Sequence, residues 1–335
     1  MIVNVTAISK IDWDSEGKRN YHIPMTYDGE WARVRIPLCV ICGIKPGKTL
    51  TVIGGTHGDE YEGPVAAKKL IENLDFSNMS GRVIIIPVLN VPAFKAGTRV
   101  SSLDGMNMNR AFPGDAKGTI TSRIARFITD EVLSRSTIVV DIHSAGETME
   151  TIRCTSFHEI QDPSMYRQSV ETASAFGTPF TMIYTSDMGS GLLTEEAEKM
   201  GIVTIGTELG YGASTDLDGV RWAYDGLNNV MKLHKMLPGE VISLLPPTHD
   251  RTILVKNTDI DTWMTAPTSG ISEPLVPIGA YVRKGDPVTC IHDFEQITKP
   301  GYIIKADRDG YVLQRRFRAS TRQGDVVMVI AEEVN

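Results

Sequence analysis

Two histidines and two glutamates stand where the sequence predicts that buried strands end. They are His57 and Glu60 after the apolar segment 51–53, His143 after 137–142, and Glu208 after 201–205. In open α/β sheets, ligands gather beyond the carboxyl ends of the strands, so residues distant in sequence can meet there. We therefore expect these four side chains to share one site.

Two imidazoles and one carboxylate match the donors that a catalytic zinc ion uses, with one position left for water. His57 and Glu60 are three residues apart in a turn flanked by glycine, and His143 would come from a neighbouring strand. A lone histidine at a strand end is more often a hydrogen-bonded structural residue, but the joint pattern favours a metal site. The sequence predicts one Zn²⁺ per chain on His57, Glu60 and His143.

Strands and helices alternate between about residues 45 and 240. The expected strands cover 51–53, 83–86, 137–142, 180–184 and 201–205, and the expected helices cover 60–74, 120–128, 163–176, 192–200 and 216–236. Residues 1–45 read as strands and turns. Such alternation is typical of an α/β fold with a mixed, largely parallel sheet covered by helices on both faces. We assign residues 1–245 to this unit, with 1–45 as a β-rich N-terminal extension.

Residues 246–335 show a different pattern, with short strands, many turns and no helical stripe. A weak internal repeat relates residues 282–291 to 321–330, and each copy carries a Gly-Asp pair, Gly285-Asp286 and Gly324-Asp325. Two similar β units predict a small C-terminal barrel or sandwich with pseudo-twofold symmetry. The repeat has no lysine at a hairpin tip, which argues against a biotinyl or lipoyl carrier.

The net charge and the apolar content of the chain limit the kinds of molecule that it is expected to bind. The formal charge is −7, so there is no basic surplus for nucleic acid. No apolar run approaches the length needed to span a bilayer, and no export signal is visible, so we expect a cytoplasmic protein without a membrane partner. The four cysteines then read as reduced thiols, and Cys39 and Cys42 should point to opposite faces of one strand. A homo-oligomer is compatible with the sequence.

The motifs together resemble the succinylglutamate desuccinylase/aspartoacylase family, part of the zinc carboxypeptidase clan. They are His57-x-x-Glu60, the run 104–114 with Asn109-Arg110 and Phe112-Pro113-Gly114, Asp141-Ile-His143, and Thr207-Glu208. Their order and spacing match over about residues 45–235, and the β-rich tail is similar to the family's second domain. The Asn-Arg motif is quite specific, and the others are specific only in combination.

This resemblance implies roles for the site residues. His57, Glu60 and His143 would be the zinc ligands, as the donor chemistry already suggests. Asn109 and Arg110 would bind a substrate carboxylate, which a planar guanidinium can grip with two hydrogen bonds. Taken alone, Arg110 would be interpreted as a surface residue in an ion pair and Asn109 as a turn residue.

Glu208 would be the general base, although by itself it reads as a solvated carboxylate at a strand end. Arg99 is the candidate for polarising the scissile carbonyl, with a longer gap to Asn109 than aspartoacylase has. The resemblance also implies a tyrosine from the second domain. Tyr281, Tyr302 and Tyr311 are the candidates, and the sequence does not choose among them.

The function implied is a zinc-dependent deacylase that hydrolyses the amide bond of a small N-acyl amino acid. The extended N-terminal region is similar to the branch that includes the deacetylase of N-α-acetyl-diaminobutyrate. Two alternatives remain: a carboxypeptidase acting on peptides, and a non-catalytic binding protein on the same fold. The second domain should distinguish the deacylase from the carboxypeptidase, because a domain that caps the cleft admits only small substrates.

Overall fold

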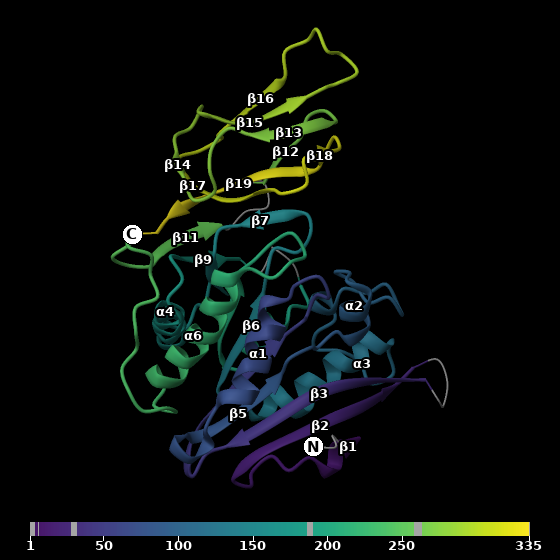
Figure 1. Cartoon of the computed structure of the whole chain (residues 1–335), viewed down its shortest axis with the longest axis vertical. Coiled ribbons are helices and arrows are strands. Elements are labelled where there is room, and N and C mark those ends of the chain that lie inside the picture. The colour runs from purple at the N-terminus through teal and green to yellow at the C-terminus, as the bar shows by residue number, and fades with distance from the viewer. Residues whose placement is uncertain (1–3, 6, 28–31, 186–189, 258–262, 335) are drawn as a thin grey trace.

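The computed structural model describes the chain except residues 1–3, 6, 28–31, 186–189, 258–262 and 335. A large α/β unit carries the N-terminus, and a smaller β unit lies at its other end (Figure 1). One long mixed sheet connects them.

The long sheet has the strand order β1-β2-β3-β5-β4-β6-β10-β8-β9-β11-β19-β17-β14. The strands of the α/β unit are β1 (Asn4–Val5), β2 (Gly17–Thr26), β3 (Arg33–Cys42), β4 (Lys45–Gly54), β5 (Ser80–Ile86), β6 (Ile138–His143), β7 (Met149–Thr151), β8 (Cys154–His158), β9 (Phe180–Tyr184), β10 (Val203–Glu208) and β11 (Ile253–Asn257). Strands β5, β4, β6 and β10 run parallel, while β3 is antiparallel to β5 on one side and β8 is antiparallel to β10 on the other. The predicted mixed sheet is confirmed, and its parallel centre places the carboxyl ends of β4, β6 and β10 together.

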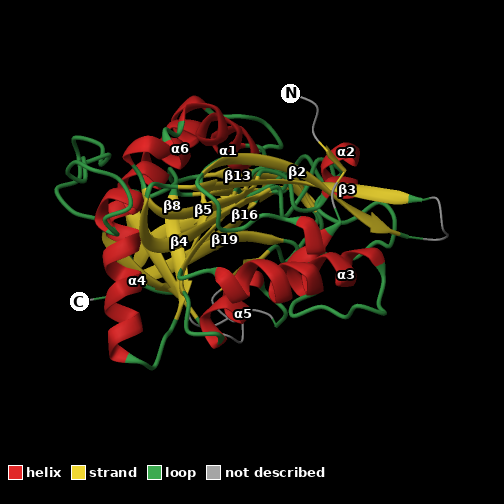
Figure 2. Ribbon diagram, turned by 90° about the horizontal axis from the view of Figure 1, so that it is seen from below, coloured by secondary structure: helices red, strands yellow, loops and turns green. Residues whose placement is uncertain are grey.

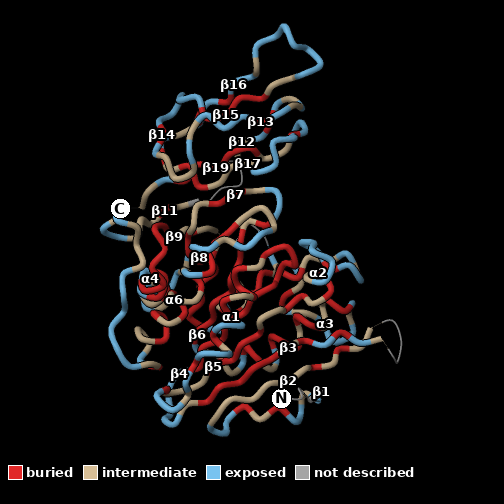
Figure 3. The backbone as a smooth tube through the Cα atoms, in the orientation of Figure 1, coloured by how far each residue is buried: buried red, intermediate tan, exposed pale blue. Residues whose placement is uncertain are grey.

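Helices cover both faces of this sheet (Figure 2). They are α1 (Glu62–Asn73), α2 (Val91–Ala96), α3 (Ile120–Phe127), α4 (Pro163–Phe176), α5 (Leu193–Lys199) and α6 (Leu217–Leu233). Apolar side chains of α1, α4 and α6 pack on one face, and those of α3 and α5 pack on the other. Because both faces are covered, β6 is buried throughout and the apolar segments of β4 and β5 are buried, as their continuous apolar runs predict (Figure 3).

The expected elements are present, with small shifts at their ends. The strand expected at 201–205 extends to Glu208, and the strand expected at 137–142 includes His143. His143 and Glu208 therefore occupy the last positions of strands rather than loop positions. Cys39 packs in the core on one face of β3 and Cys42 in the core on the other, as the alternation of strand side chains predicts.

The C-terminal unit is built from short strands around its own apolar core. Its strands are β12 (Trp263–Thr265), β13 (Gly270–Pro274), β14 (Tyr281–Val282), β15 (Pro287–His292), β16 (Tyr302–Lys305), β17 (Gly310–Arg316), β18 (Ser320–Thr321) and β19 (Val326–Glu333). Strands β16, β15, β13 and β18 form a second sheet.

The internal repeat is confirmed by matching turns. Asp286 accepts a hydrogen bond from the amide of Arg283, and Asp325 accepts one from Arg322, each at 2.8 Å. The amides of Gly285 and Gly324 likewise each donate to an alanine carbonyl at 2.8 Å. Each turn joins a short strand to a long one, so the two copies fold alike.

The two units share hydrogen-bonded strands. After residue 245 the chain first adds β11 to the long sheet beside β9, and β19 then pairs with β11. Strand β7 pairs with β17 of the C-terminal unit. The C-terminal unit is therefore fixed against the carboxyl ends of the central strands by backbone hydrogen bonds. None of the helices in the described part of the chain has the length and apolar character to cross a membrane.

Candidate metal centre and active site

His57, Glu60 and His143 meet at the carboxyl end of the parallel strands. Their donor atoms all lie within 4.8 Å of one another, and all three residues are buried. The loop after β4 supplies His57 and Glu60, and the last residue of β6 supplies His143. The structure thus brings together the three residues that the sequence predicted as ligands.

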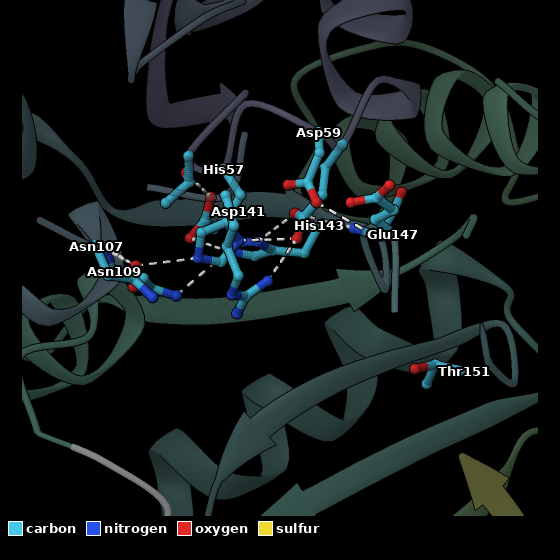
Figure 4. A network of polar contacts seen from close by, with 12 residues as sticks. His57, Asp59, Asn107, Asn109, Asp141, His143, Glu147 and Thr151 are labelled. Carbon is cyan, nitrogen blue, oxygen red and sulfur yellow. Dashed lines mark hydrogen bonds and ion pairs between the residues drawn. The ribbon is translucent and has the colours of Figure 1, made fainter. Parts of the chain in front are cut away.

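In the neutral imidazoles of His57 and His143, the surrounding hydrogen bonds place the proton on Nε2, so the lone pair of each Nδ1 faces Glu60. The Asn107 side-chain oxygen accepts a hydrogen bond from the amide of Asn109 at 2.9 Å, so the 3.2 Å contact with His57 requires the His57 Nε2 to donate. The His143 Nε2 donates to the Asp141 carboxylate at 2.8 Å (Figure 4). In the neutral rings, both Nδ1 atoms are therefore unprotonated.

These Nδ1 atoms each lie 2.8 Å from an oxygen of Glu60. A carboxylate can only accept hydrogen bonds, so each of these two contacts joins two acceptors unless a proton or a cation lies between them. Burial opposes protonation of His143, but the Asp141 and Glu60 carboxylates raise its pKa above the ordinary value. The negative potential of these two carboxylates, which stabilises a proton on His143, would stabilise a doubly charged cation more strongly. The residues present therefore fit a zinc ion.

Asp141 orients His143 and is itself held in place. It is fully buried, and its second oxygen accepts a hydrogen bond from the Thr56 hydroxyl at 2.9 Å. Residues two apart on a strand share a face, which explains why Asp141 and His143 meet. Sequence reasoning quoted Asp141 within a motif but gave it no role, and Asn107 was missed in the same way. The i, i+2 spacing before His143 was the available signal for Asp141.

Glu208 stands beside this centre on β10, opposite His143 on β6. Its Oε2 is buried and has no hydrogen-bond partner among the described residues. Burial raises the pKa of Glu208 to about 8, and the nearby Glu60 carboxylate acts in the same direction. A bound cation would lower this pKa again and leave a carboxylate able to accept a proton.

Arg99, Asn109 and Arg110 lie around the centre. The Arg99 guanidinium donates to the Glu60 Oε1 at 3.1 Å, and half of its side chain is exposed. Asn109 is buried, and its Oδ1 accepts from the amide of Leu193 at 2.9 Å, which leaves its NH₂ near His143. Arg110 is exposed as a whole, but partial burial of its guanidinium and the nearby charge of Arg99 lower its pKa below the ordinary value.

A cleft of about 530 Å³ opens beside the centre, between the two units. The α/β unit lines it with residues that include Asp59, Arg99 and Glu208, and the C-terminal unit lines it with Trp263, Gln314, Arg316 and Val326. Among the described lining residues, none of the candidate tyrosines 281, 302 and 311 appears. Tyr281 and Tyr311 instead contact each other with ring centroids 5.2 Å apart. The C-terminal unit therefore contributes an indole to the cleft.

Comparison with known proteins decides the family. The model of the succinylglutamate desuccinylase/aspartoacylase catalytic domain matches residues 46–234, which is more than half of the chain and holds the whole metal centre. The chain belongs to the succinylglutamate desuccinylase/aspartoacylase family. The resemblance carried by the sequence motifs is thereby confirmed.

Several members of this family are similar over almost their whole length. The N-α-acetyl-L-2,4-diaminobutyric acid deacetylase of Halomonas elongata is 32% identical, over 97% of this chain and 94% of the relative. A succinylglutamate desuccinylase/aspartoacylase structure from Rhodobacter sphaeroides superposes with a TM-score of 0.91 at 32% identity, covering 97% and 98% of the two chains. The product-bound ectoine utilization protein EutE of Ruegeria pomeroyi gives 0.88 at 32% identity, covering 96% and 98%.

Three histidines outside the centre lie close to polar side chains of other elements. The His158 Nδ1 lies 2.5 Å from a Glu198 oxygen, and His234 lies between Lys48 and Thr172. His292 lies 2.6 Å from Glu273 and near Cys290 in the C-terminal unit. These partners come from other elements of the fold, which a linear reading does not bring together.

Proposed function

We propose that this protein is a zinc-dependent deacylase that hydrolyses the amide bond of a small N-acyl amino acid. The observation that carries the proposal is the convergence of His57, Glu60 and His143, whose ligand atoms lie within 4.8 Å of one another, beside the buried Oε2 of Glu208, which has no hydrogen-bond partner among the described residues. Family membership supports amide hydrolysis, and the deacetylase name of the Halomonas relative supports an N-acyl amino acid as substrate. An N-acetyl-diaminobutyrate-type substrate is the finer proposal.

A bound zinc ion lowers the pKa of its water to about 7 and polarises a carbonyl oxygen. Glu208 lies beside that position and would take the proton from the attacking water and deliver it to the leaving amine. Arg99 would donate to the oxygen of the scissile carbonyl as negative charge develops there. Asn109 and Arg110 would hold a carboxylate of the substrate.

The cleft supports a small substrate over a peptide. Its volume of about 530 Å³ lies within the range of small-molecule sites, and Trp263 and Arg316 of the C-terminal unit form part of its wall. A long peptide would have to pass these side chains. We propose in addition that the α/β unit is zinc-carboxypeptidase-like and that the protein acts in the cytoplasm.

Metal analysis joined to a hydrolysis screen tests the proposal. Purified protein should hold close to one zinc per chain and cleave N-acetyl amino acids. Chelation should abolish cleavage, and added zinc should restore it. Cleavage that persists at full rate in metal-stripped protein would contradict the proposal, as would failure to cleave N-acetyl, N-formyl and N-succinyl amino acids with zinc bound.

A further inference from the structure

The C-terminal unit holds a second group of metal-ligand side chains, apart from the centre described above. Glu273, Cys290 and His292 offer a carboxylate, a thiol and an imidazole, and their ligand atoms all lie within 4.8 Å of one another. None of the three belongs to the described lining of the cleft, and all lie in the sheet β16-β15-β13-β18 rather than in the long sheet. This group therefore has no part in the proposed deacylase site.

The register of β13 and β15 brings these side chains together. The two strands are antiparallel, with Glu273 directly opposite Cys290, and His292 follows Cys290 by two residues. Residues directly opposite each other, and residues two apart on one strand, share a face of the sheet. The backbone ladder thus places all three donors on one face, so their meeting does not depend on a loop.

The side chains are also turned toward one another. The His292 Nε2 lies 2.6 Å from the Glu273 Oε2. The Cys290 Sγ and the His292 Nδ1 both border Gly301, where an added Cβ would overlap the sulfur and lie 3.0 Å from the nitrogen. The backbone passes this close to both donors only because residue 301 is glycine, so no side chain at this position covers them.

Burial gives the group one closed side and one open side. Cys290 is only 4% exposed, whereas the side chains of His292 and Glu273 are 40% and 56% exposed. A cation can therefore reach the group from solvent and keep a water ligand, while the thiol is fixed by its surroundings.

The donor set selects a zinc-like cation. Thiolate, imidazole and carboxylate are all zinc ligands, whereas Mg²⁺ and Ca²⁺ take oxygen ligands. Three protein ligands and one water complete the tetrahedron that zinc prefers. On binding, the thiol S–H bond breaks, a bond from sulfur to the cation forms, and the proton leaves to solvent.

We propose that Glu273, Cys290 and His292 form a second zinc site, which joins β13 to β15 and is independent of the catalytic centre. Because two of its three ligands are half-exposed, this site binds zinc more weakly than the buried centre. The protein should thus retain one zinc through dialysis and take up a second in titration. The inference goes beyond the proposed function and holds whether or not the protein hydrolyses amides.

Cobalt distinguishes the two sites, because only the second contains sulfur. Co²⁺ titrated into the metal-stripped full-length protein should produce a thiolate-to-cobalt charge-transfer band in the near ultraviolet, and added zinc should abolish the band by displacement. The proposed ligand atoms of the first centre are nitrogen and oxygen, and Cys39, Cys42 and Cys154 belong to no such group among the described residues. An excess of Mg²⁺ should leave the band unchanged.

Single variants of the ligands test the assignment. Cys290→Ser should remove the band, and His292→Gln and Glu273→Gln should weaken cobalt and zinc binding at this site by about tenfold or more. Glu295→Gln changes an exposed carboxylate in the next loop, outside the group; it is the matched control and should keep the wild-type affinity. If Cys290→Ser does not fold, the half-exposed His292→Gln variant decides, since it retains the thiol. No band in the wild-type protein, or a band with wild-type affinity in Cys290→Ser or His292→Gln, overturns the inference.

Discussion

At the residue scale, Glu208 combines a buried carboxylate with a position beside the metal ligands. Its burial is unfavourable for the charged form, as the raised pKa of about 8 records. A carboxylate such as that of Glu208, which is buried against the preference of its charged form and lies opposite His143 on the adjacent strand, is typical of a catalytic base.

We expect Glu208→Gln to lower kcat by at least about 10²-fold, because the amide cannot accept the proton from water. Zinc content should not change, since Glu208 is outside the ligand set. The metal-stripped variant should also unfold at a higher temperature than metal-stripped wild type, because a neutral amide is less costly to bury than a carboxylate. Steady-state kinetics with metal analysis and thermal unfolding check these outcomes. Wild-type turnover in the zinc-loaded variant would remove Glu208 from the reaction.

Asp141 acts on the metal through His143. Asp141→Asn should weaken zinc binding by about 10- to 100-fold, because the amide stabilises the Nε2–H tautomer of His143 less well than a carboxylate does. Competition with a chromophoric chelator measures the affinity. Thr56→Val is the graded control: it removes only the hydrogen bond to the far oxygen of Asp141 and should have a smaller effect. Equal zinc affinity in Asp141→Asn and wild type would contradict this role.

At the element scale, the loop between β4 and α1 must adopt one conformation to place His57 and Glu60 on the same point. Gly58 lies in this loop against α2, where an added Cβ would lie 2.0 Å from the carbonyl carbon of Ala93. The backbone of Ala93 and Phe94 leaves no room for a side chain.

Gly58→Ala should therefore destabilise the protein by about 1–3 kcal/mol or more and reduce zinc content, because the loop must move away from α2. Gly201→Ala is the control. It changes a glycine after α5, where nothing lies within 4 Å of the added Cβ, so only the strain of φ +77° applies. Denaturant unfolding and metal analysis compare the two. A Gly58 variant that binds zinc as tightly as wild type would show that the loop position is not required.

His234 links three elements and should make stability depend on pH. It follows α6, its Nε2 contacts Thr172 of α4 at 3.0 Å, and its Nδ1 contacts Lys48 of β4 at 3.0 Å. Burial lowers the pKa of His234 from 6.5 to about 4, and the Lys48 charge acts in the same direction. The folded protein thus resists a proton that the unfolded chain accepts.

The contribution of His234 to the free energy of unfolding is fully present above pH 6.5. It falls by about 1–2 kcal/mol, after allowance for solvent screening, as the pH decreases from 6.5 to 4. In His234→Gln, that part of the pH dependence should disappear. Urea unfolding between pH 4 and 7 measures it, with His249→Gln to report the loss of a histidine elsewhere. An unchanged slope in His234→Gln would contradict the assignment.

At the scale of the whole molecule, the C-terminal unit completes the cleft because strands fix it there. Strand β17 pairs with β7, and the Arg315 guanidinium binds the Glu150 carboxylate at 2.6 Å across this junction. Only 10% of the Glu150 side chain is exposed, so its charge depends on this partner.

Arg315→Ala should cost about 1–3 kcal/mol of unfolding free energy, because it leaves the Glu150 carboxylate without its cation. Arg251→Ala is the matched control, since its partner Glu333 is more exposed and Arg251 itself is 65% exposed; its cost should stay below about 1 kcal/mol. Adding Glu150→Gln to Arg315→Ala should recover part of the loss. Equal costs for the two arginines would show that the junction contributes no special stability.

The sequence by itself determined the local structure and pointed to the three residues that we propose as metal ligands. Continuous apolar runs predicted strands covered on both faces, and the Gly-Asp turns revealed the repeat of the C-terminal unit. His57, Glu60 and His143 were recognisable because zinc donors stood at strand ends, and a short-range pattern carries that information.

The tertiary structure decided what depends on strand order and on contacts between distant segments. Parallel pairing of β6 with β10 sets Glu208 opposite His143, and no local pattern specifies that register. The wall that Trp263 gives to the cleft also arises only when the two units meet. Burial and missing partners are properties of the packed chain, so they could not be predicted from residue types and spacing.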